Sequence, residues 1–306
     1  TNDSDENPFN FTITGVVNAP TTFTVTTIAD SGPGSLRQAI KDANSDPGPD
    51  EIRFAIPGVG THTISLISGL PVIKDPVVVN GNTQPGFAGQ PLIQLDGTDA
   101  GTSDGIKITA GRSIIRGLII SRFQQSGIVL ADGGNNVVEG NYIGTDSTGM
   151  SARGNDFGIK VEAGSAGNRI GTDGDGLNDA TEANLLSGNR ADGVLIKQVG
   201  TDDNVVAGNL IGTDITGTVA LANNHGIRIE NGAKRNRLGT NGDGTSDEAE
   251  RNVISGNRLG GVLIIDAGSD ENVVAGNYVG TTITGASVLG NLQSGVIISG
   301  GAKQNV

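Results

Sequence analysis

Two acidic, glycine-rich segments carry the side chains best suited to chemistry in this sequence. They run from Gly171 to Asn184 (GTDGDGLNDATEAN) and from Gly239 to Asn252 (GTNGDGTSDEAERN), 68 residues apart. Clustered carboxylates of this kind can hold a divalent cation, act as catalytic acids and bases, or solvate a surface loop. Their recurrence at a fixed distance indicates that a repetitive scaffold positions both copies.

The spacing of the oxygen-bearing residues resembles that of an EF-hand loop, whose ligands fall at positions 1, 3, 5, 7, 9 and 12 with glycine at 6. Gly176 and Gly244 take the sixth position, but glycine also stands at position 1, where a ligand is usual. The predicted Ca²⁺ ligands are Asp173, Asp175, Leu177 (through its carbonyl), Asp179 and Glu182 in the first copy, and Asn241, Asp243, Thr245, Asp247 and Glu250 in the second.

An acidic surface turn is the alternative interpretation of both segments. Asp-Gly and Asn-Gly steps form turns without any ligand. Asp179 can also cap the first turn of a short helix. The calcium interpretation predicts that Ca²⁺ raises the melting temperature of the protein and that EGTA reverses the effect.

The amino-acid composition excludes some kinds of site and argues against some kinds of binding partner. The 306-residue chain has a formal net charge of −13 and no cysteine. Disulfides and thiolate metal sites are therefore excluded, and a nucleic-acid partner or an anionic membrane surface is not expected, because both need a basic patch. The acidic balance suits binding of divalent cations. No run of 18 apolar residues occurs, so membrane insertion is not expected, and the N-terminal TNDSDENPFN does not have the pattern of a signal peptide.

Short internal repeats predict the fold. The hexapeptides NVVEGN, NVVAGN and NVVAGN begin at Asn136, Asn204 and Asn272, 68 residues apart, and NLLSGN and NVISGN begin between them at Asn184 and Asn252. Apolar runs such as Gly-Ile-Lys-Ile alternate with the period of a strand. Without the inserted segments that begin Gly-Thr, the repeat shortens to roughly 20 to 22 residues, which is one coil of a β-solenoid.

Asparagine recurs just before the apolar run of each coil. Such residues fit tight turns and can hydrogen-bond to the equivalent residue of the next coil. The sequence therefore predicts an asparagine ladder through positions 136, 168, 204, 236, 272 and 305.

The G-I-x-I and N-x-V-x-G-N units over residues 103–306 resemble the right-handed parallel β-helix repeats of pectate-lyase-like bacterial proteins. The resemblance implies an all-β, right-handed parallel β-helix. It leaves function open, because the same repeat serves lyases, hydrolases, epimerases, adhesins and surface proteins.

Residues 20–102 are predicted to form an N-terminal cap and the first coils, continuous with the regular coils of 103–306. Ser35–Ala43 reads as a short amphipathic capping helix, with Ser35 and Gln38 forming a capping box. The motif Gly34-Ser-Leu-Arg-Gln-Ala39 resembles the Cys-Ser-Leu-Arg-Glu-Ala region of large bacterial surface proteins, which implies a secreted or cell-surface setting. Residues 1–19 resemble the closing strand of an immunoglobulin-like module.

A catalytic centre is the competing expectation. Asp202 and Asp203 align two coils away from Asp270 and Glu271, roughly 10 Å apart at the strand spacing of a solenoid. A carbohydrate-active enzyme should also bring carboxylates together with a basic residue in a groove, for which Arg116, Arg122 and Lys160 are candidates. His62 and His225 stand in unlike contexts and do not predict a triad. Tyr142 and Tyr278 recur with Leu210 between them and are expected to be packing variants.

The function predicted from these patterns is a structural or adhesive segment of an extracellular or cell-surface bacterial protein, stabilised by calcium and contacting a cell-surface glycan or protein. The alternative is a polysaccharide lyase or glycoside hydrolase on the same fold.

Overall fold

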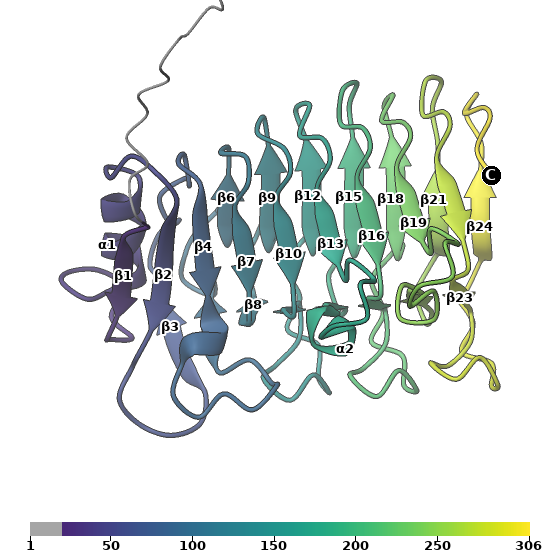
Figure 1. Cartoon of the computed structure of the whole chain (residues 1–306). Coiled ribbons are helices and arrows are strands. Elements are labelled where there is room, and N and C mark those ends of the chain that lie inside the picture. The colour runs from purple at the N-terminus through teal and green to yellow at the C-terminus, as the bar shows by residue number, and fades with distance from the viewer. Residues whose placement is uncertain (1–19) are drawn as a thin grey trace, which may run out of the picture.

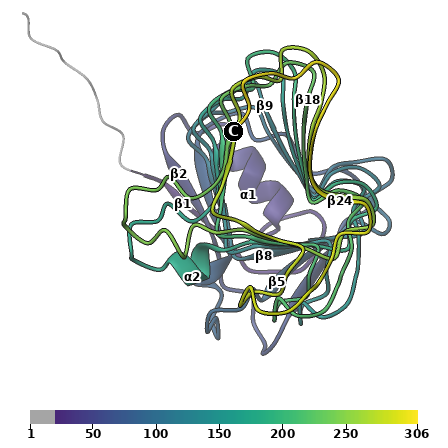
Figure 2. The ribbon, with the colours of Figure 1, turned by 90° about the vertical axis from the view of Figure 1, so that its right-hand side faces the viewer.

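The protein is an all-β, right-handed parallel β-helix closed at its N-terminal end by a short helix, as the sequence predicts (Figure 1). The computed structural model describes residues 20–306. The expected immunoglobulin-like remnant at 1–19 lies outside this range. Viewed along the solenoid axis, three faces enclose the core (Figure 2).

Each face is one parallel sheet, and each full coil supplies one strand to each sheet. We call the sheets A, B and C in the order in which the chain visits them. Sheet A contains β1 (Thr22–Val25), β2 (Asp50–Phe54), β4 (Val77–Asn80), β7 (Ile114–Arg116), β10 (Val137–Glu139), β13 (Arg169–Gly171), β16 (Val205–Ala207), β19 (Arg237–Gly239) and β22 (Val273–Ala275).

Sheets B and C repeat this stacking order. Sheet B contains β3 (His62–Ser65), β5 (Ile93–Asp96), β8 (Leu118–Ser121), β11 (Tyr142–Ile143), β14 (Leu185–Leu186), β17 (Leu210–Ile211), β20 (Val253–Ile254) and β23 (Tyr278–Val279). Sheet C contains β6 (Ile106–Ile108), β9 (Ile128–Ala131), β12 (Ile159–Glu162), β15 (Val194–Lys197), β18 (Ile227–Glu230), β21 (Gly260–Ile264) and β24 (Ser294–Ile298).

The register places equivalent residues of successive coils in straight columns. Val138 pairs with Ile170, Ile170 with Val206, and Val206 with Leu238, and all four side chains are fully buried. Alternate residues of each strand point inward, so these columns merge into one continuous apolar core.

Three asparagine ladders connect successive coils by hydrogen bonds at the turns between the sheets. The predicted ladder through Asn136 and Asn168 to Asn305 is confirmed: in each step the backbone N–H and the side-chain amide of one Asn donate to Oδ1 of the next. The structure adds two further ladders. One runs through Asn141, Asn184, Asn209, Asn252 and Asn277, and the other through Asn155, Asn189, Asn223, Asn257 and Asn291.

The helix α1 (Leu36–Ala43) lies across the first coil and buries Leu36 and Ile40 against it. Ser35 is its N-cap, because its Oγ accepts the Gln38 N–H at 3.2 Å. The predicted capping box is only half formed: the Gln38 side chain donates to Asp42 at 2.7 Å instead of reaching back to Ser35. Among the described helices, which also include α2 (Asp179–Glu182) and the 3-10 turn η1 (Gly81–Thr83), none is long and apolar enough to cross a membrane.

The inserted loops leave the solenoid at two different corners. The acidic loops follow β13 and β19 and so lie between sheets A and B, where α2 projects in Figure 2. The other Gly-Thr segments follow β11, β17 and β23, between sheets B and C, and each forms a hairpin closed by an antiparallel bridge such as Thr145 to Ala152. Both rows of loops therefore flank the outer face of sheet B.

Candidate metal centre and the two cavities beside it

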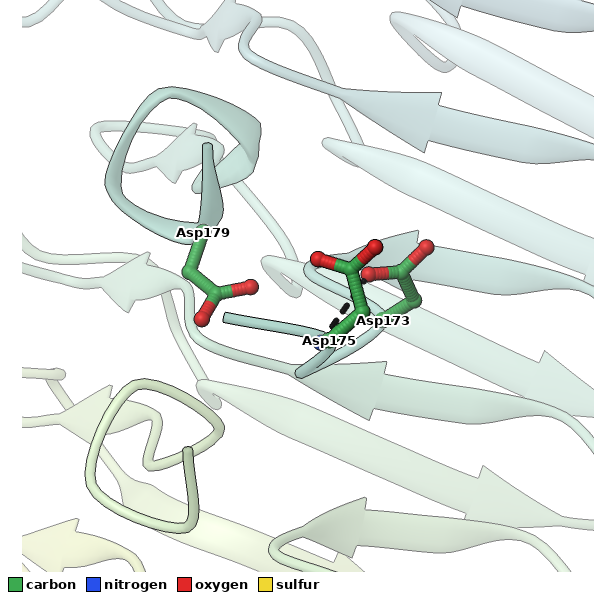
Figure 3. Close-up of side chains that lie close together, drawn as sticks. All are labelled: Asp173, Asp175 and Asp179. Atoms are coloured by element: carbon green, nitrogen blue, oxygen red, sulfur yellow. Dashed lines mark hydrogen bonds between the residues drawn. The ribbon is translucent and has the colours of Figure 1, made fainter. Parts of the chain in front are cut away.

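The first acidic loop brings three of its predicted ligands together. One carboxylate oxygen each from Asp173, Asp175 and Asp179 lies within 4.8 Å of the other two (Figure 3). Asp173 and Asp175 are exposed, and Asp179 projects toward them from the first turn of α2. Three carboxylates this close repel one another, so a divalent cation between them would be favoured.

Local hydrogen bonds hold this arrangement. The Thr172 hydroxyl donates to Asp179 at 2.7 Å, and the Leu177 N–H donates to Asp175 at 2.7 Å. The Asp175 N–H donates to Asp173 at 3.3 Å. Hydrogen bonds within the loop therefore fix all three carboxylates, and Asp173 Oδ2 also lies 3.9 Å from the Arg169 guanidinium.

The other two predicted ligands of this loop lie differently. Glu182 accepts the Asp173 N–H at 3.2 Å and forms an ion pair with Arg169 at 3.2 Å. It thus fastens the loop to strand β13 and is not one of the three clustered carboxylates. Leu177, which was predicted to act through its backbone carbonyl, is 67% exposed and lies next to the cluster, because its N–H donates to Asp175.

The second acidic loop repeats the turn but not the cluster. The Thr240 hydroxyl donates to Asp247 at 2.7 Å, and the Thr245 N–H donates to Asp243 at 2.7 Å. Asn241 occupies the place of Asp173, and its amide donates to Asp243 at 2.9 Å. Over residues 20–306, the first loop alone groups three acidic or histidine side chains this tightly.

Glu250 links the two loops. Its carboxyl is fully buried; Oε2 accepts the Asn241 N–H at 2.8 Å, and Oε1, which has no hydrogen bond, lies 3.6 Å from the Arg237 guanidinium. A Cβ on Gly174 would lie only 2.7 Å from this Oε1. The glycine between Asp173 and Asp175 has a left-handed backbone conformation (φ +73°) and leaves room for the Glu250 side chain, which lies beneath the first loop with its Oε1 in an ion pair with Arg237.

A polar cavity of about 610 Å³ opens beside α2, lined by Arg116, Glu139 and Glu182 among others. Arg169 joins the two glutamates, at 2.8 Å from Glu139 and 3.2 Å from Glu182, and Arg116 lies 3.5 Å from Glu139. Burial raises the pKa of Glu182 above its ordinary value, and the nearby Asp173 charge adds to this, against the opposing effects of Arg169 and the Asp173 N–H.

An apolar groove of about 480 Å³ continues from this cavity, because Gly89 and Thr181 line both. Its floor is the outer face of sheet B, where one column runs in register through Tyr142, Leu185, Leu210, Val253 and Tyr278. Tyr142 and Leu185 belong to a small apolar cluster outside the main core, which supports the packing interpretation of this column.

The remaining predicted acids and bases do not meet. Asp202 and Asp270 accept the backbone N–H of Lys234 and Lys303 in the turn before the first ladder, at 3.0 and 2.7 Å. Asp203 pairs with Arg235 at 2.9 Å, and its counterpart Glu271 stands in the equivalent turn. Of the three candidate bases, Arg116 lines the polar cavity, whereas Arg122 pairs with Asp96 and Lys160 with Glu162 on other surfaces.

Sequence patterns missed a charged cluster on sheet C. Buried Asp192 lies 2.9 Å from His225 Nδ1 and 3.5 Å from Arg228 Nε. The signal was available in the repeat, since Asp192 and His225 both precede the glycine of the G-apolar-x-apolar unit in successive coils. His62 lies far away, on β3.

No protein-family model matches the chain, and a search of curated proteins finds no match. Among solved structures, the alginate lyase of Paenibacillus sp. str. FPU-7 aligns with 93% of this chain and 98% of its own, at TM-score 0.37 and 16% identity. The Dettilon tailspike protein (gp208) aligns with 88% of this chain and 56% of its own, at TM-score 0.36 and 15% identity. The Azotobacter vinelandii mannuronan C-5 epimerase AlgE6 A-module aligns with 93% of this chain and 99% of its own, at TM-score 0.32 and 13% identity. Similarity at this level carries no functional argument, and the fold is established by the three sheets of this chain itself.

Proposed function

We propose that this chain is a rigid, adhesive segment of an exported bacterial protein, stabilised by calcium at its first acidic loop. The observation that carries the proposal is the repetition of the outer surface. One core runs through all the coils, three ladders join the coils from Asn136 to Asn305, and within that stretch the same two loop types return on every second coil. A solenoid built in this way is a stiff support for a repeated surface.

Calcium is the chemically suited cation for the first loop. Carboxylate and carbonyl oxygens are its usual ligands, and Asp173, Asp175 and Asp179 supply three of them from one turn. The neighbouring loop offers fewer charges because Asn241 replaces an aspartate. Calcium would therefore act at one coil, where it would neutralise the repulsion between the carboxylates and fasten the loop.

The expected partner surface is a glycan or a protein of a cell surface. The test compares retention with turnover: the chain is immobilised and exposed to a panel of acidic and neutral polysaccharides, with and without Ca²⁺. The adhesive proposal expects no release of reducing ends or unsaturated sugars from any polysaccharide, whether or not it is retained. Sustained release of such products would contradict the proposal.

A carbohydrate-active enzyme is the second candidate, and the polar cavity favours it. Glu139 and Glu182 both pair with the Arg169 guanidinium, and the pKa of Glu182 is raised. Two carboxyls whose pKa values differ can act as the acid and the base of one reaction. If this candidate is correct, Glu182→Gln will lower the rate of polysaccharide cleavage by at least about a hundredfold, the usual size of a general acid's contribution. Glu248→Gln, an exposed change on the second acidic loop outside this cavity, serves as the matched control. Equal rates in both variants would exclude Glu182 as the acid.

A further inference from the structure

The polar cavity lies where two successive coils turn from sheet A to sheet B without an inserted loop. Strands β4, β7, β10 and β13 are neighbours in sheet A. Inserted segments follow β4 and β13, whereas β7 and β10 lead into sheet B after one and two residues. The cavity therefore has its floor at β7 and β10, and its walls are residues 81–92 and the first acidic loop. The strands that carry the two walls are about 14 Å apart at the spacing of a parallel sheet.

Hydrogen bonds to the neighbouring coils hold both walls in place. In the first wall, the buried Gln84 side chain accepts the Ile56 N–H at 3.0 Å and donates to the Ile56 carbonyl at 2.8 Å. In the second wall, the Glu182 carbonyl accepts the Gly140 N–H at 2.8 Å, and the Glu182 side chain pairs with Arg169. The walls are thus fixed without a ligand, so little affinity is lost to ordering them when a ligand binds.

The charged groups in and beside the cavity balance one another. Glu139 lies between Arg116 and Arg169, and Arg169 also pairs with Glu182. Two guanidinium groups therefore face two carboxyls, and neither sign is in excess within this group of four. A strongly charged ligand would have to compete with these ion pairs, so the cavity favours an uncharged one.

The cavity combines an aromatic surface with hydrogen-bond donors that the fold does not use. Phe87 is half-buried and lines the first wall. Arg116 donates through Nε to Asn80 at 3.0 Å, and its Nη1 lies 3.5 Å from Glu139, which leaves Nη2 without a partner within residues 20–306. Asn178 is exposed on the second wall, and its side-chain amide does not cap α2. A sugar ring fits such a lining, because its C–H groups can pack on an aromatic face while its hydroxyls donate and accept hydrogen bonds.

We propose that this cavity binds a short uncharged saccharide of a cell-surface glycan, with the Phe87 ring against one face of a sugar and with Arg116 and Asn178 donating to its hydroxyls. The volume of about 610 Å³ lies within the range of small-ligand sites, about 300–1,000 Å³. The inference rests on the adhesive function proposed above and names its partner. It does not depend on calcium, because none of the three clustered aspartates lines this cavity.

The test probes an array of neutral and acidic glycans with the fluorescently labelled 306-residue chain, and then measures the Kd of the best-bound neutral oligosaccharide by calorimetry. Phe87→Ala removes the aromatic ring. Asn178→Gly removes the amide and keeps the left-handed backbone at this position, where φ is 64°. Ser246→Gly is the matched control, because Ser246 occupies the equivalent position of the second acidic loop, has φ 51° and does not line the cavity. The melting temperature of each variant checks that its fold is retained.

The proposal expects neutral glycans to bind better than acidic ones. Phe87→Ala should weaken the Kd at least about tenfold, as loss of a central aromatic anchor does. Asn178→Gly should weaken it about fivefold, the effect of one hydrogen bond, and Ser246→Gly should leave it within about twofold.

Three results would overturn the inference and leave the adhesive function intact: no binding of any neutral glycan, stronger binding of acidic glycans, or an effect of either cavity variant no larger than that of Ser246→Gly. Release of sugars from the bound oligosaccharide on long incubation would instead contradict the adhesive function, while the cavity would remain a saccharide site.

Discussion

At the residue scale, asparagine defines the corners of this fold. The first ladder could be predicted because its Asn residues precede each apolar run at regular intervals. The other two were not predicted, because the same hexapeptide has Asn at both ends and the sequence does not say which corner each end occupies. NLLSGN, for example, places Asn184 in the second ladder and Asn189 in the third.

Removing one ladder residue should destabilise the solenoid strongly. Asn209→Ala removes the donor to the Ile170 and Ala207 carbonyls and the acceptor of the Asn184 N–H, all in the interior. Each buried group left without a partner costs about 1–3 kcal/mol, so denaturant unfolding should show a loss of at least about 2 kcal/mol. Asn224→Ala is the control, since Asn224 lies outside the ladders and donates its backbone N–H to Ala191. Similar losses in both variants would show that the ladder is not the source of stability.

At the element scale, the sequence predicted the lengths of the inserted loops. It did not predict at which corner of the solenoid each loop projects. The spacing predicted Asp173, Asp175 and Asp179 as ligands of one cation, and these three carboxylates lie within 4.8 Å of one another, because residues two to four apart in a tight turn stay close. The spacing did not predict that Glu182 and Glu250 form ion pairs with Arg169 and Arg237. A pattern confined to the loop residues does not include arginines on the preceding strand.

The hairpin after β11 depends on Asp146. Burial alone would raise the pKa of this carboxyl, but hydrogen bonds from Thr148, Met150 and Ser151 outweigh burial and lower the pKa below its ordinary value of 3.8. A lowered folded-state pKa gives stability that is present above pH 3.8 and is lost as pH falls through the folded-state value.

Asp146→Asn should therefore lower stability by about 1 kcal/mol at neutral pH, and the difference from the parent should vanish in acid. Thermal unfolding across the acid range measures this difference. Asp132→Asn, at an exposed turn, is the matched control and should show no such trend. A difference for Asp146→Asn that persists at the lowest pH would mean that the carboxylate charge is not responsible.

At the scale of the whole molecule, the repeat period of the sequence predicted a solenoid. The amphipathic pattern of residues 35–43 predicted the helix that caps it. The two cavities could not be predicted, because each is formed by loops from different coils that meet over sheet B. Tyr142 and Tyr278 are 136 residues apart in sequence, yet they lie in one column of one groove.

The proposed function includes stabilisation by calcium, and this claim is tested most directly by measuring the melting temperature of the protein as Ca²⁺ is titrated. Asp173→Asn gives the first loop the residue of the second, and Asn241→Asp does the reverse. Calcium at about 100 times its Kd should stabilise the parent by about 2.7 kcal/mol, with reversal by EGTA. Asp173→Asn should reduce this response, and Asn241→Asp should retain or increase it. No rise in melting temperature in the parent at millimolar Ca²⁺, or an equal rise in the parent and in Asp173→Asn, would contradict the account.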